Sequence, residues 1–375
     1  MGLLPSGRIG IEQTFSDTTL SAFRREIHLE EVDGYRSSFD RYFVQTSKEE
    51  KAKRGDDPYY DKVDDVFMEE WGITIWDLQG ASKFLCLEMF HRFGSSVALI
   101  NEVDLLKIFQ GNEQDDGLQA RRILDLLTFR TRDGVLNVNP KELHEAFPWR
   151  YNRRESYMLR PLIRMEAGKE ITYIVSARHV LMATENMLAR FMDGTLKVGK
   201  DQFKLINLLA ERNHMKGKSF RDGITKWLSD YTTLQVFDFE VKIKPHGFFT
   251  AADDKGDVDI LCVDHIGKRI IAIECKNTSQ AKIAYEIYTE ISSYIGINGK
   301  PGMIQKHVQR DLWLKENLDQ VLEKLGLEYS YQVESIVLTK HVLPTKFIKD
   351  TDIPVYSYSE LKRGEVFSLK TSSAI

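Results

Sequence analysis

Residues 256–277 read GDVDILCVDHIGKRIIAIECKN, which is two apolar runs joined by a short polar segment. The joining segment, residues 264–268, contains the glycine and polar residues that allow a hairpin to reverse direction. The runs are rich in isoleucine, leucine and valine, a composition typical of strands that are buried on both faces. We therefore predict an antiparallel pair of strands at the centre of a layered α/β domain.

Charged residues interrupt both apolar runs at every second position. Asp257 and Asp259 lie in the first run, and Glu274 and Lys276 lie in the second. Side chains two residues apart on a strand share a face, and antiparallel neighbours bring such side chains into contact. The sequence thus predicts a group of carboxylates and one ammonium on a rigid sheet.

These residue types suit a metal-dependent phosphodiesterase. Mg2+ prefers oxygen ligands, which Asp259, Glu274 and the backbone carbonyl of Cys275 would supply, and Mn2+ is the alternative cofactor. Lys276 would orient the metal-bound water, help to deprotonate it or stabilise the transition state. The alternative is a set of cross-strand ion pairs on a solvated sheet, but buried carboxylates are costly unless they are paired or metal-bound.

At these residues the chain resembles the PD-(D/E)xK nuclease superfamily, in particular its RecB-like and resolvase-like branches. The resemblance covers roughly residues 217–344 and implies a restriction-endonuclease-like α-β-β-β-α-β core. It also implies Mg2+-dependent cleavage of nucleic acid with Asp259, Glu274 and Lys276 as the catalytic residues. Apolar periodicity supports that order and predicts elements at residues 219–231 (helix), 234–243 (strand), 281–295 (helix), 303–325 (helix) and 331–343 (strand).

The sequence offers two candidates for a third metal ligand. Many members of the superfamily carry a glutamate directly after a phenylalanine of the first helix, but Arg221 follows Phe220 here. Asp222 is the nearest acid on that helix, and Asp257 is the other candidate. The glutamine and tyrosine that RecB-like nucleases place after the lysine are one residue too far apart here, so we assign them no role.

The predicted helix over residues 303–325 carries basic residues in its first half. Lys306, His307 and Arg310 are about one turn apart and are candidates for contacts with a phosphodiester backbone. The alternative is an ordinary solvated helix face, and the sequence leaves both open.

A second basic segment, residues 148–164, interleaves arginines with tryptophan and tyrosine. Arg150, Arg153 and Arg154 belong to it. Arginine with aromatic residues is typical of nucleic-acid contacts, through phosphate forks and base stacking, and equally of protein interfaces. A structural ion-pair network with the acidic linker is the third interpretation.

The chain is long enough for more than one hydrophobic core, because a single core seldom exceeds 250–300 residues. We predict four regions. They are 1–62 (an N-terminal arm and charged linker), 63–140 (a helical bundle), 141–212 (a mixed α/β region with the arginine-rich segment) and 213–375 (the nuclease-like domain).

Whole-chain composition narrows the choice of function. There are 52 basic and 56 acidic residues with a formal net charge of −4, so any contact with nucleic acid must be local. Three cysteines favour a reducing cytoplasm over a disulfide framework, and no stretch has the length of a membrane span or the apolar core of a signal peptide.

The sequence therefore predicts a cytoplasmic nuclease that acts on nucleic acid, DNA favoured, in restriction, repair or antiviral defence. The N-terminal region would serve as a contact in a homo-oligomer or a larger complex. The alternative is a catalytically idle module that keeps the nuclease fold for nucleic-acid binding or complex assembly.

Overall fold

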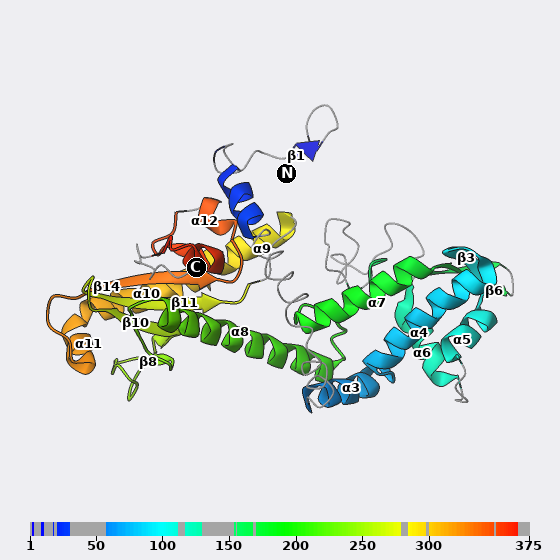
Figure 1. The fold of residues 1–375 in the computed structure, drawn as a ribbon, viewed down its shortest axis with the longest axis horizontal. Coiled ribbons are helices and arrows are strands. Elements are labelled where there is room, and N and C mark those ends of the chain that lie inside the picture. Colours follow the sequence, from blue (N-terminus) through cyan, green and yellow to red (C-terminus); the bar gives the residue numbers. More distant parts are fainter. Residues whose placement is uncertain are drawn as a thin grey trace. The chain divides into compact units, whose positions relative to one another are not determined.

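The chain divides into two compact units, which we describe separately (Figure 1). The C-terminal unit comprises Lys216–Ile375 together with Met1–Thr46, and the middle unit comprises Ser47–Met215. The computed structural model describes residues 2–3, 9–10, 18, 21–30, 58–111, 117–129, 154, 156–167, 170–278, 284–297, 300–348 and 350–366.

The C-terminal unit is built on a mixed five-stranded sheet in the order β15-β14-β11-β10-β7. Figure 1 labels β14, β11 and β10 of this sheet. β10 is antiparallel to β7 and β11, whereas β11, β14 and β15 are parallel. The predicted hairpin is present as β10 and β11, with Cys262 opposite Ile271. The five strands are β7 (Gln235–Val236), β10 (Ile260–Asp264), β11 (Arg269–Lys276), β14 (Gln332–Thr339) and β15 (Val355–Ser357).

Helices cover both faces of this sheet, so the motif strands are buried on both sides as predicted. α10 (Met303–Glu316) and α11 (Leu318–Leu325) pack on the face that contains Leu261, Val263 and Ala272. The second half of α8 (Phe203–Tyr231) and α13 (Tyr358–Lys362) pack on the opposite face, against Ile260, Ile271 and Ile273. The α/β class predicted from the sequence is confirmed.

Two predicted elements are each divided in the structure. The strand expected at 234–243 becomes β7 and β8 (Val241–Ile243), and β8 pairs with β9 (Gly256–Val258) in a separate sheet. The helix expected at 303–325 breaks at Asn317, where φ is −112° and ψ is 32°. The Asn317 amide donates to the carbonyl of Trp313 at 2.8 Å and so ends α10.

The remaining elements of this unit are short, apart from α9. They are β1 (Gly2–Leu3), β2 (Ile9–Gly10), α9 (Ala284–Ile295), β12 (Gly296–Ile297), β13 (Lys300–Pro301) and α12 (Thr345–Ile348). Between α8 and β14 the chain runs through β7, β8, β9, β10, β11, α9, β12, β13, α10 and α11.

A helical stretch from the predicted N-terminal arm, residues 21–30, belongs to the C-terminal unit. Phe23 packs against Phe347, with ring centroids 5.5 Å apart. Arg363 donates to Glu26 at 2.6 Å, and the backbone N–H of Val342 donates to a Glu30 carboxylate oxygen at 3.1 Å. An apolar contact and two charge-assisted contacts therefore hold this stretch beside the segment that follows β14.

The middle unit combines a four-stranded sheet, in the order β3-β6-β5-β4, with helices that share one hydrophobic core. The first half of α8 also belongs to this unit. Its other elements are α3 (Pro58–Trp71), α4 (Ile75–Glu88), the π-helical turn η1 (Met89–Phe93), β3 (Val97–Asn101), α5 (Glu102–Gln110), α6 (Leu118–Leu127), β4 (Thr128–Phe129), β5 (Leu162–Ala167), β6 (Glu170–Ser176) and α7 (Ala177–Met192).

Two features of the middle unit differ from the sequence-based expectation. The charged linker, expected to extend to residue 62, is helical from Pro58 onward, because proline suits the first helical position and Val63 and Phe67 give the helix a buried face. The region expected to be wholly helical contributes β3, which pairs with β6. Among the helices in the described ranges, none combines the length and hydrophobicity needed to cross a membrane.

Candidate active site

Asp259 lies at a bend between β9 and β10 rather than inside one continuous strand. Its Oδ2 accepts a hydrogen bond of 2.7 Å from the backbone N–H of Cys275 on β11. Among the described residues, no donor bonds to its Oδ1. Burial, followed by repulsion from Glu274, raises the pKa of Asp259 to about 6. Burial and the neighbouring Glu274 therefore disfavour the charged form of Asp259, against the opposing influence of Lys276 and Arg310.

Glu274 on β11 is the buried centre of the site, with 7% of its surface exposed. Its Oε1 is 2.5 Å from the Lys276 ammonium, and its Oε2 is 2.6 Å from the Arg310 guanidinium. Burial alone would lower the pKa of Lys276, but the Glu274 and Asp259 carboxylates together outweigh burial and the pKa is raised. Lys276 is thus a protonated group at the carboxyl end of β11, beside Asp259 and Glu274.

Arg310 and His307 of α10 face inward, toward Glu274. His307 is fully buried, and burial lowers its pKa to about 4, so its ring is neutral and its Nδ1 accepts from Arg310 Nε at 3.4 Å. A Cβ at Gly256 would lie 3.1 Å from Arg310 Nη1, and Gly256 has a φ of +88°. The glycine that opens the motif therefore permits both the backbone turn and the close approach of Arg310.

Tyr294 on α9 is a further polar group near the acids that sequence reasoning did not identify. It is 2% exposed, and its hydroxyl has no hydrogen-bond partner in the part of the chain that the structure describes. Burial, then the charges of Glu290 and Glu274, raise its pKa. Its phenol is therefore a buried donor within electrostatic range of Glu274.

The arrangement provides a donor set that fits a hard divalent cation. Asp259 supplies an oxygen, Oδ1, that accepts no hydrogen bond from the residues that the structure describes. Glu274 supplies a second carboxylate, and the backbone carbonyl of Cys275 lies between Glu274 and Lys276 in the chain. The thiol of Cys275 packs in the core on the opposite face, with its pKa raised by burial, so it is not a candidate ligand. A cation here would favour the charged form of Asp259, which burial and Glu274 disfavour.

The two candidates for a third carboxylate lie elsewhere. Asp257 is on β9, which belongs to the other sheet, and exposed Asp222 pairs with Arg221 at 2.9 Å. Neither joins Asp259 and Glu274 in a group of three close ligands within the described ranges. The group of three that those ranges do contain is Glu26, Glu360 and Glu365, and their carboxylates are already paired with Arg363 and Lys346.

The basic residues predicted on α10 do not form one surface. Lys306 is exposed, whereas His307 and Arg310 are buried against the sheet. His307 and Arg310 are buried because they lie on the same face of α10 as Ile304, about one turn before His307, and Leu314, about one turn after Arg310. A phosphodiester backbone in solvent could reach Lys306 alone of these three.

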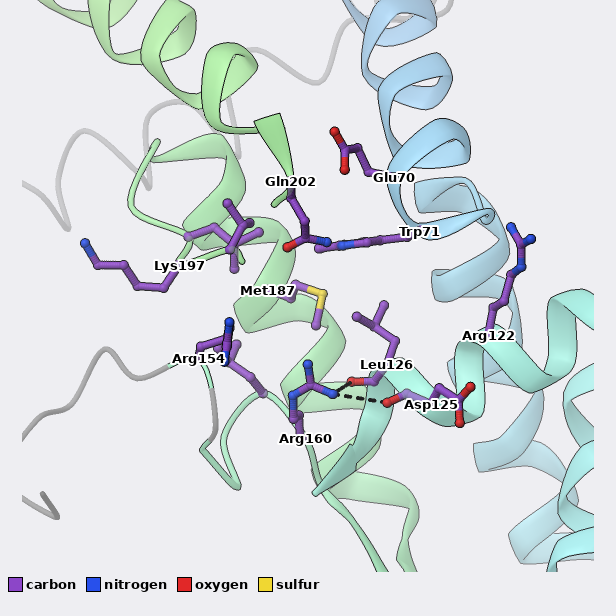
Figure 2. A pocket seen from close by; sticks show the side chains of 13 residues that line it. Glu70, Trp71, Arg122, Asp125, Leu126, Arg154, Arg160, Met187, Lys197 and Gln202 are labelled. Carbon is purple, nitrogen blue, oxygen red and sulfur yellow. Dashed lines mark hydrogen bonds between the residues drawn. The ribbon is translucent and has the colours of Figure 1, made fainter. Parts of the chain in front are cut away.

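The predicted arginine-rich segment is described only in part. Arg150 and Arg153 lie outside the described residues, and Arg154 lines a cavity of the middle unit (Figure 2). The candidate catalytic residues, in contrast, lie together at one end of the inner strands β10 and β11 of the C-terminal sheet.

The site joins a carboxylate pair and a lysine on a doubly covered α/β sheet. The family model of Upx-like anti-phage proteins matches residues 30–354, and the chain belongs to that family. The protein therefore belongs to a family of proteins that defend against bacteriophage, and the matched residues include the whole candidate site. No curated protein and no solved structure shows significant similarity to the chain.

Proposed function

We propose that this protein defends against phage as a divalent-metal-dependent nuclease that hydrolyses phosphodiester bonds, DNA being the favoured substrate. The observation that carries the proposal is that Asp259, at the bend before β10, lies beside Glu274 of β11, next to a Lys276 that is ion-paired to Glu274. Two carboxylates and one lysine at the end of a rigid sheet match the needs of phosphoryl transfer, which are positioning and charge stabilisation.

Asp259, Glu274 and the carbonyl of Cys275 are the residues that would hold Mg2+ or Mn2+. The bound metal supplies Lewis-acid polarisation of the phosphate and a water of lowered pKa. The hydrogen bond from the Cys275 N–H fixes one Asp259 oxygen, so the other is presented in a defined direction. Arg310 orients Glu274 from the side of α10.

Lys276 would act on the phosphate rather than on the metal. Its raised pKa keeps the ammonium protonated at neutral pH, which suits stabilisation of the negative charge that develops on the phosphate oxygens. A general-base role would require a neutral amine, so the raised pKa of Lys276 favours the electrostatic role.

A second candidate function is a catalytically idle module for nucleic-acid binding or assembly. It is favoured by one observation: both oxygens of Glu274 already contact cationic side chains, so the buried charge is balanced without a metal. If the protein is a nuclease, the metal must displace Lys276 or Arg310 from Glu274, or share a Glu274 oxygen with one of them.

The test is incubation of the full-length protein with Mg2+, Mn2+, Ca2+ or EDTA and a panel of linear and circular DNAs and RNAs. The nuclease proposal predicts that the protein cleaves at least one substrate with Mg2+ or Mn2+ and cleaves no substrate with EDTA. Ca2+, which prefers more ligands and a looser geometry, should support binding better than turnover. Metal binding by calorimetry without cleavage of any substrate would instead establish the idle module.

A further inference from the structure

The four-stranded sheet of the middle unit has one face that points away from the core of that unit. The inward positions Ile100, Tyr173 and Val175 are buried in the core. Successive side chains on a strand alternate between the two faces, so Leu99 and Ile174 point outward. The candidate catalytic residues belong to the C-terminal unit, so this outward face is separate from the proposed chemistry.

Four apolar side chains form a row across all four strands on the outward face. In the register of the sheet, Leu99 of β3 lies opposite Ile174 of β6, which in turn lies opposite Ile163 of β5. Phe129 of β4 is the partner of Ile163 on the other side. Paired residues on neighbouring strands point to the same face. Because an antiparallel sheet with one face in water normally places polar residues on that face, an apolar row indicates a surface that a partner covers.

Large apolar side chains are exposed on this face and at both ends of β3. Val97 and Leu99 of β3 are 53% and 62% exposed, and Met165 of β5 is 36% exposed. Phe90, in the turn before β3, is 64% exposed, and Val103, in the helix after it, is 62% exposed. β3 is also the last strand of its sheet as the structure describes it. Soluble proteins seldom leave such a concentration of apolar surface in water unless it is an interaction site.

The exposed apolar area is large enough for a stable contact. A whole aromatic side chain covers about 150 to 250 Å2, so these five partly exposed side chains together present on the order of 400 Å2. A standard protein interface takes about 800 Å2 from each partner, a little over half of it apolar. The exposed side chains can therefore supply most of the apolar part of an interface of standard size, and the half-buried Ile174, Ile163 and Phe129 add to it.

The charge of the outward face favours a second copy of this chain as its occupant. Apart from the row, the outward positions of β3 and β6 hold the neutral residues Val97, Asn101, Thr172 and Ser176, and Glu170 at the start of β6. Nucleic acid would require cations, which these positions lack. In a symmetric pair the same patch meets itself, so a charge near the two-fold axis would meet its own copy. An uncharged face avoids that repulsion.

We propose that the outward face of this sheet is the contact surface of a symmetric dimer, in which a second copy of the chain packs sheet against sheet over the row from Leu99 to Phe129. Facing sheets pack about 10 Å apart, so the side chains of the two rows can interdigitate and exclude water. Such a dimer carries two candidate nuclease centres. It forms whether or not those centres cleave nucleic acid, because the contact lies in the other unit.

The test is sedimentation equilibrium of the full-length protein over a range of concentrations up to about 100 μM, at which a dissociation constant of a few micromolar is readily measured. We expect a reversible equilibrium between monomer and dimer. Leu99→Glu should raise the dissociation constant by about a hundredfold or more, because a carboxylate would be buried against apolar surface. Met182→Glu is the matched control, since Met182 is 55% exposed on α7 of the same unit but lies outside the sheet. Both replaced side chains are exposed, so both variants are expected to fold.

A mixing experiment tests whether the two faces meet each other. An equimolar mixture of Leu99→Glu and Leu99→Lys should dimerise more tightly than either variant alone, because opposite charges then share one interface. Asp259→Ala should dimerise like the wild type. Three results would overturn the proposal: a monomeric wild type at every concentration, which would leave the face to a different protein; an unchanged dissociation constant in Leu99→Glu; and an equal loss in Met182→Glu.

Discussion

Replacing Arg310 by methionine should destabilise the C-terminal sheet strongly. Arg310 is 7% exposed and its guanidinium is 2.6 Å from the Glu274 carboxylate, so the variant leaves a buried charge with Lys276 as its remaining ion-pair partner. Breaking a buried pair typically costs about 3 to 5 kcal/mol, and the surviving Lys276 contact places this case near 3. Lys306→Met, on the exposed side of the same helix, is the matched control.

The assay is amide hydrogen exchange of the β10–β11 hairpin, which reports local opening without requiring that a chain of two units unfold in one step. A loss of about 3 kcal/mol accelerates exchange roughly a hundredfold. Adding Glu274→Gln to Arg310→Met should recover part of the loss, because the uncompensated charge disappears. Equal exchange in Arg310→Met and Lys306→Met would refute this reasoning.

Three further outcomes are expected. Gly256→Ala should cost about 1 to 3 kcal/mol in thermal unfolding, because φ is +88° and the new Cβ would lie 3.1 Å from Arg310; an unchanged midpoint would contradict it. Burial raises the pKa of Glu290 from 4.5 to about 7, so the contribution of Glu290 to stability is full below pH 4.5 and is lost as pH rises through 7. Glu290→Gln should therefore flatten the dependence of stability on pH between 4.5 and 7. Parallel stability profiles of the wild type and Glu290→Gln would disprove this link. Lys276→Ala should lower the cleavage rate roughly a hundredfold at unchanged metal affinity, whereas exposed Lys242→Ala should not; equal rates would make Lys276 a structural ion-pair partner.

The motif hairpin could be predicted because its signal is local. Alternation with a period of two, together with the Asp264–Gly267 turn, determines which residues share a face. The bend at Asp259 could not be predicted, since it depends on a hydrogen bond to Cys275, a residue sixteen positions away in the chain. The same bend transfers Asp257 to another sheet and removes it from the site.

The contribution of α10 was misjudged for a different reason. Lys306, His307 and Arg310 are closely spaced, and spacing alone does not distinguish an inward from an outward face. The available signal was the register of Ile304 and Leu314, which places His307 and Arg310 on the apolar side. Charged residues on an apolar stripe indicate a buried polar partner, and here that partner is Glu274.

The middle unit shows how far composition can lead. Arginine mixed with aromatic residues in the segment 148–164 suggested contact with nucleic acid, an interface or an ion-pair network. The structure places Arg154 and Arg160 in the lining of the same cavity as Trp71, which comes from a helix far away in sequence. A cavity formed by such distant segments depends on tertiary packing, so local patterns carry no signal for it.

The most direct test of the proposed nuclease is the single-turnover rate of DNA cleavage, measured against Mg2+ concentration. The wild type and Asp253→Asn, an exposed substitution six residues before Asp259, should share one saturable rate curve. Asp259→Ala should show no cleavage at any Mg2+ concentration while hydrogen exchange confirms a folded sheet. Cleavage by Asp259→Ala at the wild-type rate, or full wild-type activity in EDTA, would contradict the assignment of the metal centre.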